Sequence, residues 1–476
     1  MNIIEKRTKL VATIGPSSDS VEMLTKLAKA GMTTIRTNFS HGDQNEQASK
    51  MNMAKEVSKK LNKKISILLD TKGPEIRVGK IKDGSIIVNT GEIIKVKTGK
   101  DDFANHLGVK GEFSVSYEMH KDVKKGDKVL FDDGKLVTFV EEVKDGEIIV
   151  KSQNTHKLKS NKRINLPGID FSLPFLAEKD RNDVIFGITQ GIDYVAASFV
   201  NTRENVKDLK AILKENGGEH IQVISKIESV LGIKNIDSII EESDGIMVAR
   251  GDLGLEIPYQ DVPYWEKYII RSCREVGKPV IVATQMLDSM ESSPQPTRAE
   301  VTDVYWATEL GADATMLSGE SALGQFPEES VEAMSIINMR AEKEFYNKLY
   351  YKYQLDIVRK NSTGKRSEIA DKIATKTIDG DYRFVVVLSK TGELLKEIAK
   401  FRPNTAIIGI LDDERKIGSF GITSSVFPSL DSKELFQEIK MSPEAASKAI
   451  LPYGAKDGEK FLVVENDKIT ELIFNK

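Results

Sequence analysis

The sequence predicts an α/β fold whose centre is a TIM (β/α)8 barrel. Eight short apolar runs, most of them rich in β-branched residues, are bounded by polar residues or glycine, which is typical of buried parallel strands. Helix-like segments separate most of the runs, such as residues 21–30 before Gly31 and 206–216 before Gly217. Eight strand–helix units indicate a closed barrel, and a doubly wound open sheet is the alternative. The runs cover residues 10–14, 33–37, 65–69, 194–199, 221–225, 245–249, 279–283 and 312–317.

The residues that directly follow these runs favour the barrel. In a TIM barrel the active site is built from the loops that follow the strands. Those positions here carry side chains suited to catalysis or ligand binding: Asn38 and Ser40, Asp70 and Lys72, Lys226 and Glu228, Arg250 and Asp252, Thr284 and Gln285, Ser318 and Glu320. We therefore expect an active site at the carboxyl ends of the strands.

A separate domain is expected between the third and fourth runs, because the sequence between them is far longer than a strand–helix unit needs. It begins near Pro74, alternates with period two, and carries hairpin-type turn signals at Asp83-Gly84, Asp133-Gly134 and Asp145-Gly146. We predict a small antiparallel β-barrel that returns to the main barrel around residues 165–168. A domain on a strand-end loop lies over the active site and can act as a lid.

A third region follows the eighth unit. An amphipathic stretch at residues 331–349 leads into strands and helices that alternate, which indicates a C-terminal α/β domain. The strands are expected at 384–388, 406–411 and 460–464, and the helices at 369–378 and 394–399. The expected domain limits are 1–73 and 171–346 for the barrel, 74–170 for the lid and 347–476 for the C-terminal domain.

The composition excludes several classes of protein. The chain has 476 residues, more than the ~250–300 that one hydrophobic core supports. Its net charge of −3, with acidic and basic residues interspersed, gives no polybasic surface for nucleic acid or an anionic membrane. Its one cysteine, Cys273, allows no intramolecular disulfide and is expected to be a buried structural thiol. Without a signal peptide or an apolar stretch near ~20 residues, a cytoplasmic protein that binds small molecules is expected.

Three side chains after the fifth and sixth runs indicate a divalent-metal site. Lys226 and Glu228 stand two residues apart at a strand end, so their side chains point the same way, although such a couple is also common as a structural salt bridge. Asp252 follows the next strand, which brings it close to Glu228. Two carboxylates without histidine or cysteine suit Mg²⁺ or Mn²⁺, and the neighbouring lysine suggests an anionic substrate.

The segment that contains Asp252 also includes an Arg-Gly-Asp tripeptide. A role in adhesion would require an exposed extracellular loop, and this tripeptide closes a buried strand. The glycines Gly251 and Gly254 instead allow backbone N–H groups to approach an anion closely.

Oxygen-bearing side chains follow the second and third runs. Alternation along the chain places Arg36, Asn38 and Ser40 on one side. Together with Asp70, the oxygens of Asn38 and Ser40 carry little charge, which suits a monovalent cation and not zinc. His41 by itself is more typical of a satisfied loop histidine than of a catalyst.

Six segments resemble motifs of the pyruvate kinase family, and the resemblance runs through nearly the whole chain. They are Asn-Phe-Ser-His-Gly at 38–42, Leu-Asp-Thr-Lys-Gly-Pro-Glu-Ile-Arg at 69–77, Ser-Lys-Ile-Glu at 225–228, Met-Val-Ala-Arg-Gly-Asp-Leu-Gly at 247–254, Ala-Thr-Gln-Met-Leu at 283–287 and Met-Leu-Ser-Gly-Glu at 316–320. Six strings in this order are far more specific than one motif. The resemblance implies the final step of glycolysis, in which phosphoenolpyruvate gives its phosphoryl group to ADP to form pyruvate and ATP, carried out by an allosteric homotetramer.

The resemblance also implies the roles of the matching residues. Glu228 and Asp252 would hold Mg²⁺ or Mn²⁺, and the backbone of Gly251 and Asp252 would receive the substrate carboxylate. Lys226 would stabilise the transferring phosphoryl group and Arg36 would contact its phosphate. Thr284, with Ser318 and Glu320, resembles the region beside the enolate carbon.

A potassium site and a nucleotide site are implied as well. The potassium ligands would be Asn38, Ser40, Asp70 and the carbonyl of Thr71. In this family a glutamate at the position of Glu75 accompanies the need for potassium, and a lysine replaces it where the cation is dispensable. ADP would contact His41, Arg77, Asp132 and Lys162. Two departures concern ADP: Asn161-Lys162-Arg163 replaces a pair of lysines, and Leu323 stands where the family usually has a lysine.

A regulatory site is suggested by Ser389, Lys390, Thr391 and Gly392, which lie between a predicted strand and a predicted helix. Hydroxyl, ammonium and N–H groups there would suit a phosphate, and an N-capped helix without a ligand is the simpler interpretation. The family binds sugar-phosphate effectors at the corresponding loop. Its second, glycine-rich effector loop is not found in residues 453–473, which favours a monophosphorylated effector over fructose 1,6-bisphosphate.

Two other functions are compatible with parts of the sequence. A barrel lyase that stabilises an enolate with a metal would need the carboxylates but neither the lid nor the nucleotide residues. A barrel that survives only as a binding scaffold is disfavoured, because no metal or phosphoryl ligand is missing.

Overall fold

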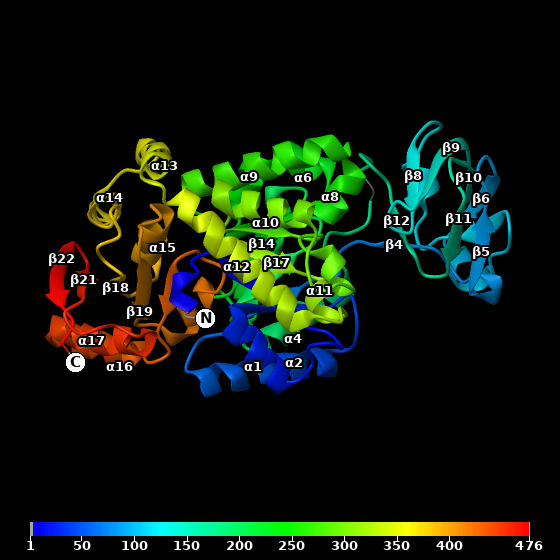
Figure 1. The fold of residues 1–476 in the computed structure, drawn as a ribbon. Coiled ribbons are helices and arrows are strands. Elements are labelled where there is room, and N and C mark those ends of the chain that lie inside the picture. Colours follow the sequence, from blue (N-terminus) through cyan, green and yellow to red (C-terminus); the bar gives the residue numbers. More distant parts are fainter. Residues whose placement is uncertain (1–2, 171, 476) are drawn as a thin grey trace.

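The computed structural model describes residues 3–170 and 172–475 of the chain. Three lobes lie in a row in Figure 1, with the barrel between the cyan lid and the yellow-to-red C-terminal domain. Residues 1, 171 and 476, at which three of the expected domain limits fall, lie outside the described residues.

The central lobe is a closed barrel of eight parallel strands, so the predicted fold is confirmed and the open-sheet alternative is wrong. Around the barrel the strand order is β1, β17, β16, β15, β14, β13, β3 and β2. Each predicted run overlaps one strand and differs from it by at most two residues at either end; the run 245–249 coincides with β15. The strands are β1 (Lys9–Thr13), β2 (Thr34–Asn38), β3 (Ser66–Asp70), β13 (Tyr194–Ala197), β14 (Gln222–Ile227), β15 (Gly245–Ala249), β16 (Val280–Ala283) and β17 (Ala314–Leu317).

Capping residues set the ends of the helices that surround the barrel. Helix α1 follows Ser20, whose hydroxyl accepts the Met23 N–H, and it ends at Gly31, where φ is 127°. Helix α5 begins three residues before its predicted start, because Thr202 and Asn205 form a capping box. The helices of this lobe are α1 (Val21–Ala30), α2 (Gln44–Leu61), α4 (Glu178–Thr189), α5 (Arg203–Glu215), α6 (Val230–Lys234), α7 (Ile236–Glu242), α8 (Arg250–Glu256), α9 (Val262–Val276), α10 (Arg298–Leu310), α11 (Gly319–Ala322) and α12 (Pro327–Phe345).

The lid is a seven-stranded sheet with an additional two-stranded ribbon, β5–β11. The sheet order is β4, β12, β8, β9, β10, β6 and β7, and a bridge between Val78 and Val115 joins its two edges. The sheet therefore wraps into the small barrel that the sequence predicts. The expected antiparallel pairing is wrong for one pair, since β6 and β7 are parallel. Its elements are β4 (Ile76–Arg77), β5 (Ser85–Val88), β6 (Ile93–Lys97), α3 (Asp102–Asn105), β7 (Glu112–Ser114), β8 (Lys128–Phe131), β9 (Leu136–Lys144), β10 (Glu147–Ser152), β11 (His156–Lys159) and β12 (Arg163–Asn165).

Two of the three predicted hairpin turns in the lid are confirmed. Asp133-Gly134 joins the antiparallel strands β8 and β9, and Asp145-Gly146 joins β9 and β10. The third prediction is wrong: Asp83-Gly84 ends a short 3-10 helix, and the strand after it, β5, pairs with β11 and not with β4. The turn signal is present, but β4, the strand before it, pairs with β12.

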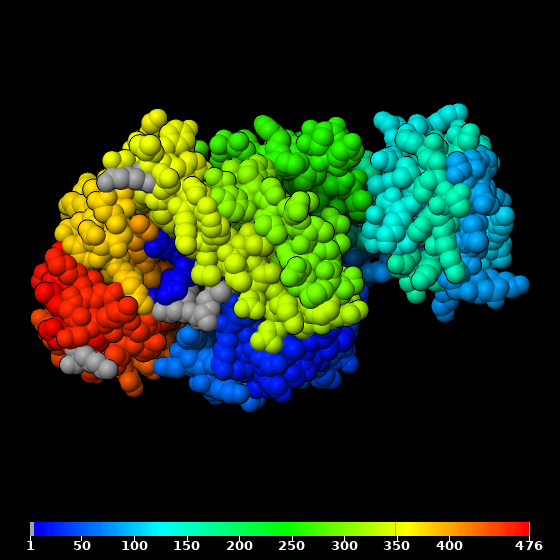
Figure 2. Space-filling model, viewed as in Figure 1, coloured from blue at the N-terminus to red at the C-terminus, as the bar shows by residue number. Residues whose placement is uncertain are grey.

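The lid is attached to the barrel through the pair formed by β4 and β12, the strands by which the chain enters and leaves it. Arg77 pairs with Arg163 and Ile76 with Ile164. Figure 2 shows the lid as a lobe that stands out from the barrel.

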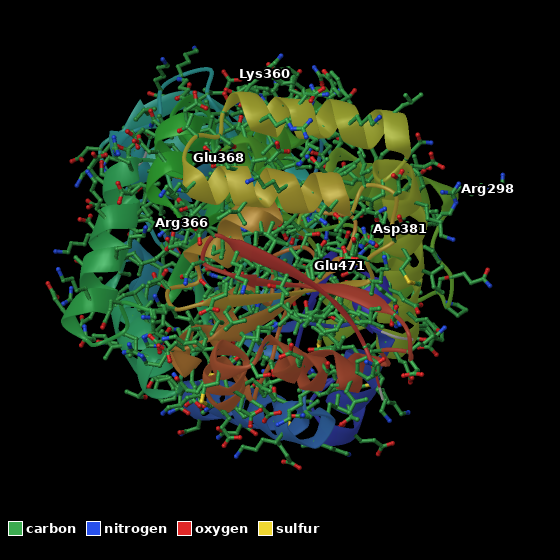
Figure 3. The ribbon with its side chains drawn as sticks, turned by 90° about the vertical axis from the view of Figure 1, so that its left-hand side faces the viewer. Arg298, Lys360, Arg366, Glu368, Asp381 and Glu471 are labelled. Atoms are coloured by element: carbon green, nitrogen blue, oxygen red, sulfur yellow. The ribbon has the colours of Figure 1, made fainter. Side chains whose placement is uncertain are left out.

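The C-terminal domain is a five-stranded sheet in the order β20, β19, β18, β21, β22, of which only β22 is antiparallel. Figure 3 looks onto this domain, with Glu471 on the edge strand β22 and Arg366 and Glu368 on α14. The predicted stretch 331–349 is interrupted, since α12 ends at Phe345. The elements are α13 (Lys348–Lys360), α14 (Lys365–Lys376), β18 (Phe384–Ser389), α15 (Glu393–Lys400), β19 (Ala406–Leu411), β20 (Val426–Pro428), α16 (Ser432–Met441), α17 (Ser447–Ile450), β21 (Lys460–Glu465) and β22 (Lys468–Ile473).

The C-terminal domain closes the amino-terminal end of the barrel. Ile422 is fully buried among side chains of the barrel interior, including Leu68 and Tyr194. The Thr33 hydroxyl donates to the Gly421 carbonyl at 2.8 Å. A side chain at Gly421 would collide with Ser66 and Thr34, so glycine is required for this close approach. The opposite, carboxyl end of the strands is left for the site.

The buried position of Ile422 yields a prediction about stability. Ile422→Ala should lower the free energy of unfolding by about 2–5 kcal/mol, because it leaves a cavity inside the barrel. Ile473→Ala is the control, since Ile473 is half exposed on β22 and its loss should cost less than about 1 kcal/mol. Urea unfolding followed by far-UV circular dichroism measures both. Equal stability of the two variants would contradict the proposed packing role of Ile422.

Candidate active site

Lys226 lies near the end of β14, surrounded by three oxygen-bearing side chains. Its Nζ is 3.1 Å from Asp70 Oδ1, 3.1 Å from Glu228 Oε1, and donates to Ser198 Oγ at 2.7 Å. Burial alone would lower the pKa of Lys226, but the carboxylates of Asp70 and Glu228 raise it above its ordinary value. Lys226 is therefore a permanent buried cation. Lys226 and Glu228 form the salt bridge that the sequence analysis gave as the structural alternative.

Arg36 supplies a second cation on the other side of Asp70. Its Nε is 2.5 Å from Asp70 Oδ2, and its Nη1 donates to Thr13 Oγ1 at 2.9 Å. Burial would raise the pKa of Asp70, but Lys226 and Arg36 hold it below its ordinary value. Asp70 is thus an ionised carboxylate between two cations.

Glu228, which is buried, and Asp252, which is partly buried, form a pair of carboxyl groups at the ends of β14 and β15. Glu228 accepts the Phe199 N–H at 2.7 Å. Burial raises the pKa of Glu228 to about 7, and the nearby Asp252 adds to the shift. Burial also acts to raise the pKa of Asp252, but Arg163 and Lys226 lower it below its ordinary value. The pair has the donor chemistry that Mg²⁺ prefers.

The two carboxylates fit a metal that shares its remaining positions with substrate and water. Among the described residues, no group of three or more His, Cys, Asp or Glu side chains is arranged to hold an ion. Mg²⁺ is typically bound by one or two carboxylates together with substrate oxygens and water. The two carboxylates of Glu228 and Asp252 match that number of protein ligands.

Arg163, which sequence reasoning did not assign to the metal centre, reaches it from the lid. Its Nη1 is 2.5 Å from Asp252 Oδ1, and its guanidinium carbon lies 5.2 Å from the centre of the Phe199 ring. Phe199 has a positive φ of 56°, a strained conformation that directs its N–H to Glu228. Such a contact between domains has no local sequence signal.

Ser198 is the second residue that sequence reasoning missed. Besides accepting from Lys226, its Oγ donates to the carbonyl of Thr71 at 2.8 Å. Ser198 follows β13, the strand between β3 and β14, and so it links Asp70 to Lys226. Its signal in the sequence was a lone hydroxyl at the end of the apolar run 194–199.

A cleft of about 1100 Å³ opens beside Asp252, between the barrel and the β8–β9 hairpin of the lid. Gly251, Thr284 and Gln285 line it from the barrel, and Asp133 lines it from the lid. The Gly251 N–H donates to Thr284 Oγ1 at 2.7 Å. Gly251, Asp252 and Thr284 are therefore neighbours along one wall of the cleft.

Ser318 and Glu320 support the neighbouring loops. The Glu320 carboxylate accepts the Ser318 N–H at 2.7 Å and the Leu287 N–H at 3.0 Å. Its hydrogen bonds therefore hold the loops after β16 and β17 together.

The four residues predicted to bind potassium come from the ends of β2 and β3. Asn38 is the register partner of Asp70, and its Oδ1 accepts the Ser40 N–H at 3.0 Å. The Thr71 carbonyl already accepts from Ser198. Asn38 and Asp70 are brought together, whereas no contact links Ser40 to Thr71 among the interactions described here.

The residues predicted to bind ADP are divided between the lid and the barrel. Asp132 pairs with Lys162 at 2.8 Å and with His156 at 2.9 Å. Burial would raise the pKa of Asp132, but these two partners lower it. Arg77 pairs with Glu75 at 2.7 Å, while His41 lies in the barrel loop before α2. Leu323, at the end of α11, is two-thirds exposed and contributes no charge.

A closed barrel whose strand ends carry Glu228, Asp252 and the buried Lys226 has the architecture of a TIM-barrel enzyme with its active site at that end. Residues 5–331 match the family model for the pyruvate kinase barrel domain. The chain is 42% identical to a pyruvate kinase of Mycoplasma pneumoniae, covering 93% of this chain and 92% of that protein. It is 41% identical to one of Clostridium acetobutylicum, covering 90% and 89%. The chain belongs to the pyruvate kinase family.

A solved structure agrees with this assignment. The crystal structure of a pyruvate kinase from Cryptosporidium parvum superposes with a TM-score of 0.90 at 34% identity, covering 99% of this chain and 97% of that one. The predicted family and activity, a phosphotransferase with ADP as acceptor, are confirmed. Enzymes of this family are generally metal-dependent, and membership implies phosphoenolpyruvate and ADP as substrates. None of the described helices has the length and apolarity that crossing a bilayer requires.

Proposed function

We propose that the chain transfers the phosphoryl group of phosphoenolpyruvate to ADP at the site around Lys226, the last step of glycolysis. The observation that carries this proposal is the buried Lys226 ammonium, held between Asp70 and Glu228 beside the Glu228–Asp252 pair. A phosphoryl group in transfer needs fixed positive charge and little covalent chemistry.

In this proposal Glu228 and Asp252 hold Mg²⁺ or Mn²⁺, which when bound neutralises negative charge on the substrate oxygens. Lys226 and Arg36 supply the protein's own positive charge to the phosphoryl group. The backbone of Gly251 and Asp252 receives the substrate carboxylate, which must compete with the Thr284 hydroxyl for the Gly251 N–H. Thr284 lies beside the enolate carbon that is protonated after the transfer.

ADP is proposed to bind between His41 of the barrel and Arg77, Asp132 and Lys162 of the lid. Lys162 is paired with Asp132, and Arg77 is paired with Glu75. The nucleotide phosphates would replace these carboxylates as the partners of the two cations. Leu323 contributes no cation, which leaves Arg77 and Lys162 as the principal basic contacts of ADP.

The domain limits 1–73, 74–170, 171–346 and 347–476, the homotetramer and the cytoplasmic location remain predictions. The same holds for the expected absence of nucleic-acid and membrane partners.

The coupled assay tests the reaction itself. Pyruvate should form from phosphoenolpyruvate only when ADP and Mg²⁺ are both present, ATP should form in equal amount, and chelation by EDTA should abolish both products. Pyruvate formed without ADP would instead support the lyase alternative. No pyruvate under any condition would reject the proposal.

Lys226→Met tests the phosphoryl role. We expect turnover to fall by about 10³–10⁵, with the KM for phosphoenolpyruvate changed little, because the charge acts in the transition state. Lys210→Met is the control, since Lys210 pairs with Asp244 outside the site. Thermal melting checks that the variant folds without its buried cation. Turnover within tenfold of the parent would make Lys226 a structural salt-bridge partner only.

The potassium site is proposed at Asn38, Ser40, Asp70 and Thr71, and Glu75 makes it testable. The Glu75 carboxylate is 2.7 Å from Arg77 Nη2 and 3.9 Å from Lys72 Nζ. Activity should be low in tetramethylammonium buffer and rise with K⁺, and Glu75→Lys should reduce this dependence by supplying a fixed ammonium. Glu141→Lys, an exposed lid substitution, should leave it unchanged. Full activity of the parent without K⁺ would contradict the prediction.

The loop from Ser389 to Gly392 is proposed to bind a monophosphorylated effector. The Gly392 N–H donates to Ser389 Oγ at 3.0 Å, and Lys416 Nζ donates to the Thr391 carbonyl at 3.2 Å, so a second ammonium lies at the loop. Sugar monophosphates or AMP should raise the affinity for phosphoenolpyruvate about 5–150-fold, the range of ~1–3 kcal/mol of coupling.

Titration at subsaturating phosphoenolpyruvate measures that coupling. Lys390→Ala and Thr391→Ala should abolish it, and Lys440→Ala, an exposed control on α16, should not. Strong activation by fructose 1,6-bisphosphate alone that survives Lys390→Ala and Thr391→Ala would reject this site.

A further inference from the structure

The ion pair between Arg163 and Asp252 joins the lid to the metal centre. Arg163 Nη1 lies 2.5 Å from Asp252 Oδ1, and both side chains are about one-fifth exposed. The guanidinium also lies over the Phe199 ring, 5.2 Å from its centre. Asp252 is one of the two carboxylates assigned to the divalent ion. A lid residue is therefore paired with one of the two carboxylates assigned to the metal.

Arg163 is a permanent cation at this position. Burial would lower the pKa of Arg163, but Asp252 and Glu228, with smaller contributions from Glu75 and Asp133, raise it above its ordinary value. A guanidinium and a divalent ion repel each other strongly at a few ångströms in a buried site. The charge of Arg163 therefore opposes the binding of a divalent ion at Asp252.

The backbone of Arg163 is fixed within the lid. Its carbonyl accepts the Asp132 N–H at 2.9 Å, and β12 is hydrogen-bonded to β4 on one side and β8 on the other. The guanidinium can therefore leave Asp252 in only two ways, by turning its own side chain or by moving with the lid.

We propose that Arg163 is a tethered competitor of the divalent cation: its guanidinium and the metal exclude each other at Asp252, which couples metal affinity to the position of the lid. Arg163 is a positioning residue in this scheme. The inference rests on the proposed assignment of Glu228 and Asp252 to the metal.

The test is a titration of the full-length protein with Mn²⁺ in the absence of substrates, with free Mn²⁺ followed by electron paramagnetic resonance. Arg163→Met and Arg163→Gln remove the charge and should each tighten Mn²⁺ binding tenfold or more. Arg163→Lys keeps a charge and should stay within about threefold of the parent. Lys144→Met removes a lid charge at the β9–β10 hairpin, where Lys144 pairs with Glu142, and should change nothing.

A second variant locates the effect at the shared carboxylate. Adding Asp252→Asn to Arg163→Met should abolish the gain in Mn²⁺ affinity. Unchanged or weaker Mn²⁺ binding by both neutral variants would overturn the proposal and make Arg163 an orienting or purely structural partner of Asp252. A gain that survives Asp252→Asn would also overturn it, because the competition would then lie elsewhere.

The outcome is separable from that of the proposed function. If the parent forms pyruvate from phosphoenolpyruvate and ADP while the neutral variants bind Mn²⁺ no more tightly, only the competition by Arg163 is rejected. If the parent forms no pyruvate, the proposed reaction is rejected whatever the Mn²⁺ titration gives.

Discussion

The balance of charge around the buried ammonium of Lys226 is the constraint on which the site depends. Buried charges are costly unless they are paired, and removing one partner leaves the others uncompensated. The register of the barrel strands supplies the pairing, since Asn38 and Asp70 are aligned on β2 and β3 and Ser198 bridges the gap to β14. Three carboxyl groups thus face three cations: Asp70, Glu228 and Asp252 against Lys226, Arg36 and Arg163.

Three of the donors proposed to contact the substrates already have a partner in the protein. Lys162 is paired with Asp132, Arg77 with Glu75, and the Gly251 N–H with the Thr284 hydroxyl. When a substrate binds at these positions, each donor exchanges one partner for another, and no mobile side chain has to be fixed in place. Groups held in place beforehand need little reorganisation when charge develops in a reaction. The same network that stabilises the fold thus prepares the site.

Much of the fold could be predicted from the sequence, because buried parallel strands are short apolar runs and their ends carry the polar residues of the site. Lys226, Glu228 and Asp252 were found in this way. The burial of Ile422 in the barrel interior and the contact of Arg163 with Asp252 could not be, since each joins segments far apart in the chain. The hairpin predicted at Asp83-Gly84 was wrong for a related reason. A local turn signal does not determine which strand will pair with the strand that follows the turn.

The pairing of β4 with β12 bears on the order in which the chain folds. Strands β3 and β13 are neighbours in the barrel, yet the whole lid is synthesised between them. Bringing the ends of a long flexible loop together costs conformational entropy before the barrel gains any contact. A lid that folds first brings its own two ends together through β4 and β12, and it takes the lid's own residues out of that loop. Domains generally fold as units. The lid would then have two roles. During folding it would bring β3 and β13 close enough for the barrel to close, and in the folded protein it covers the site.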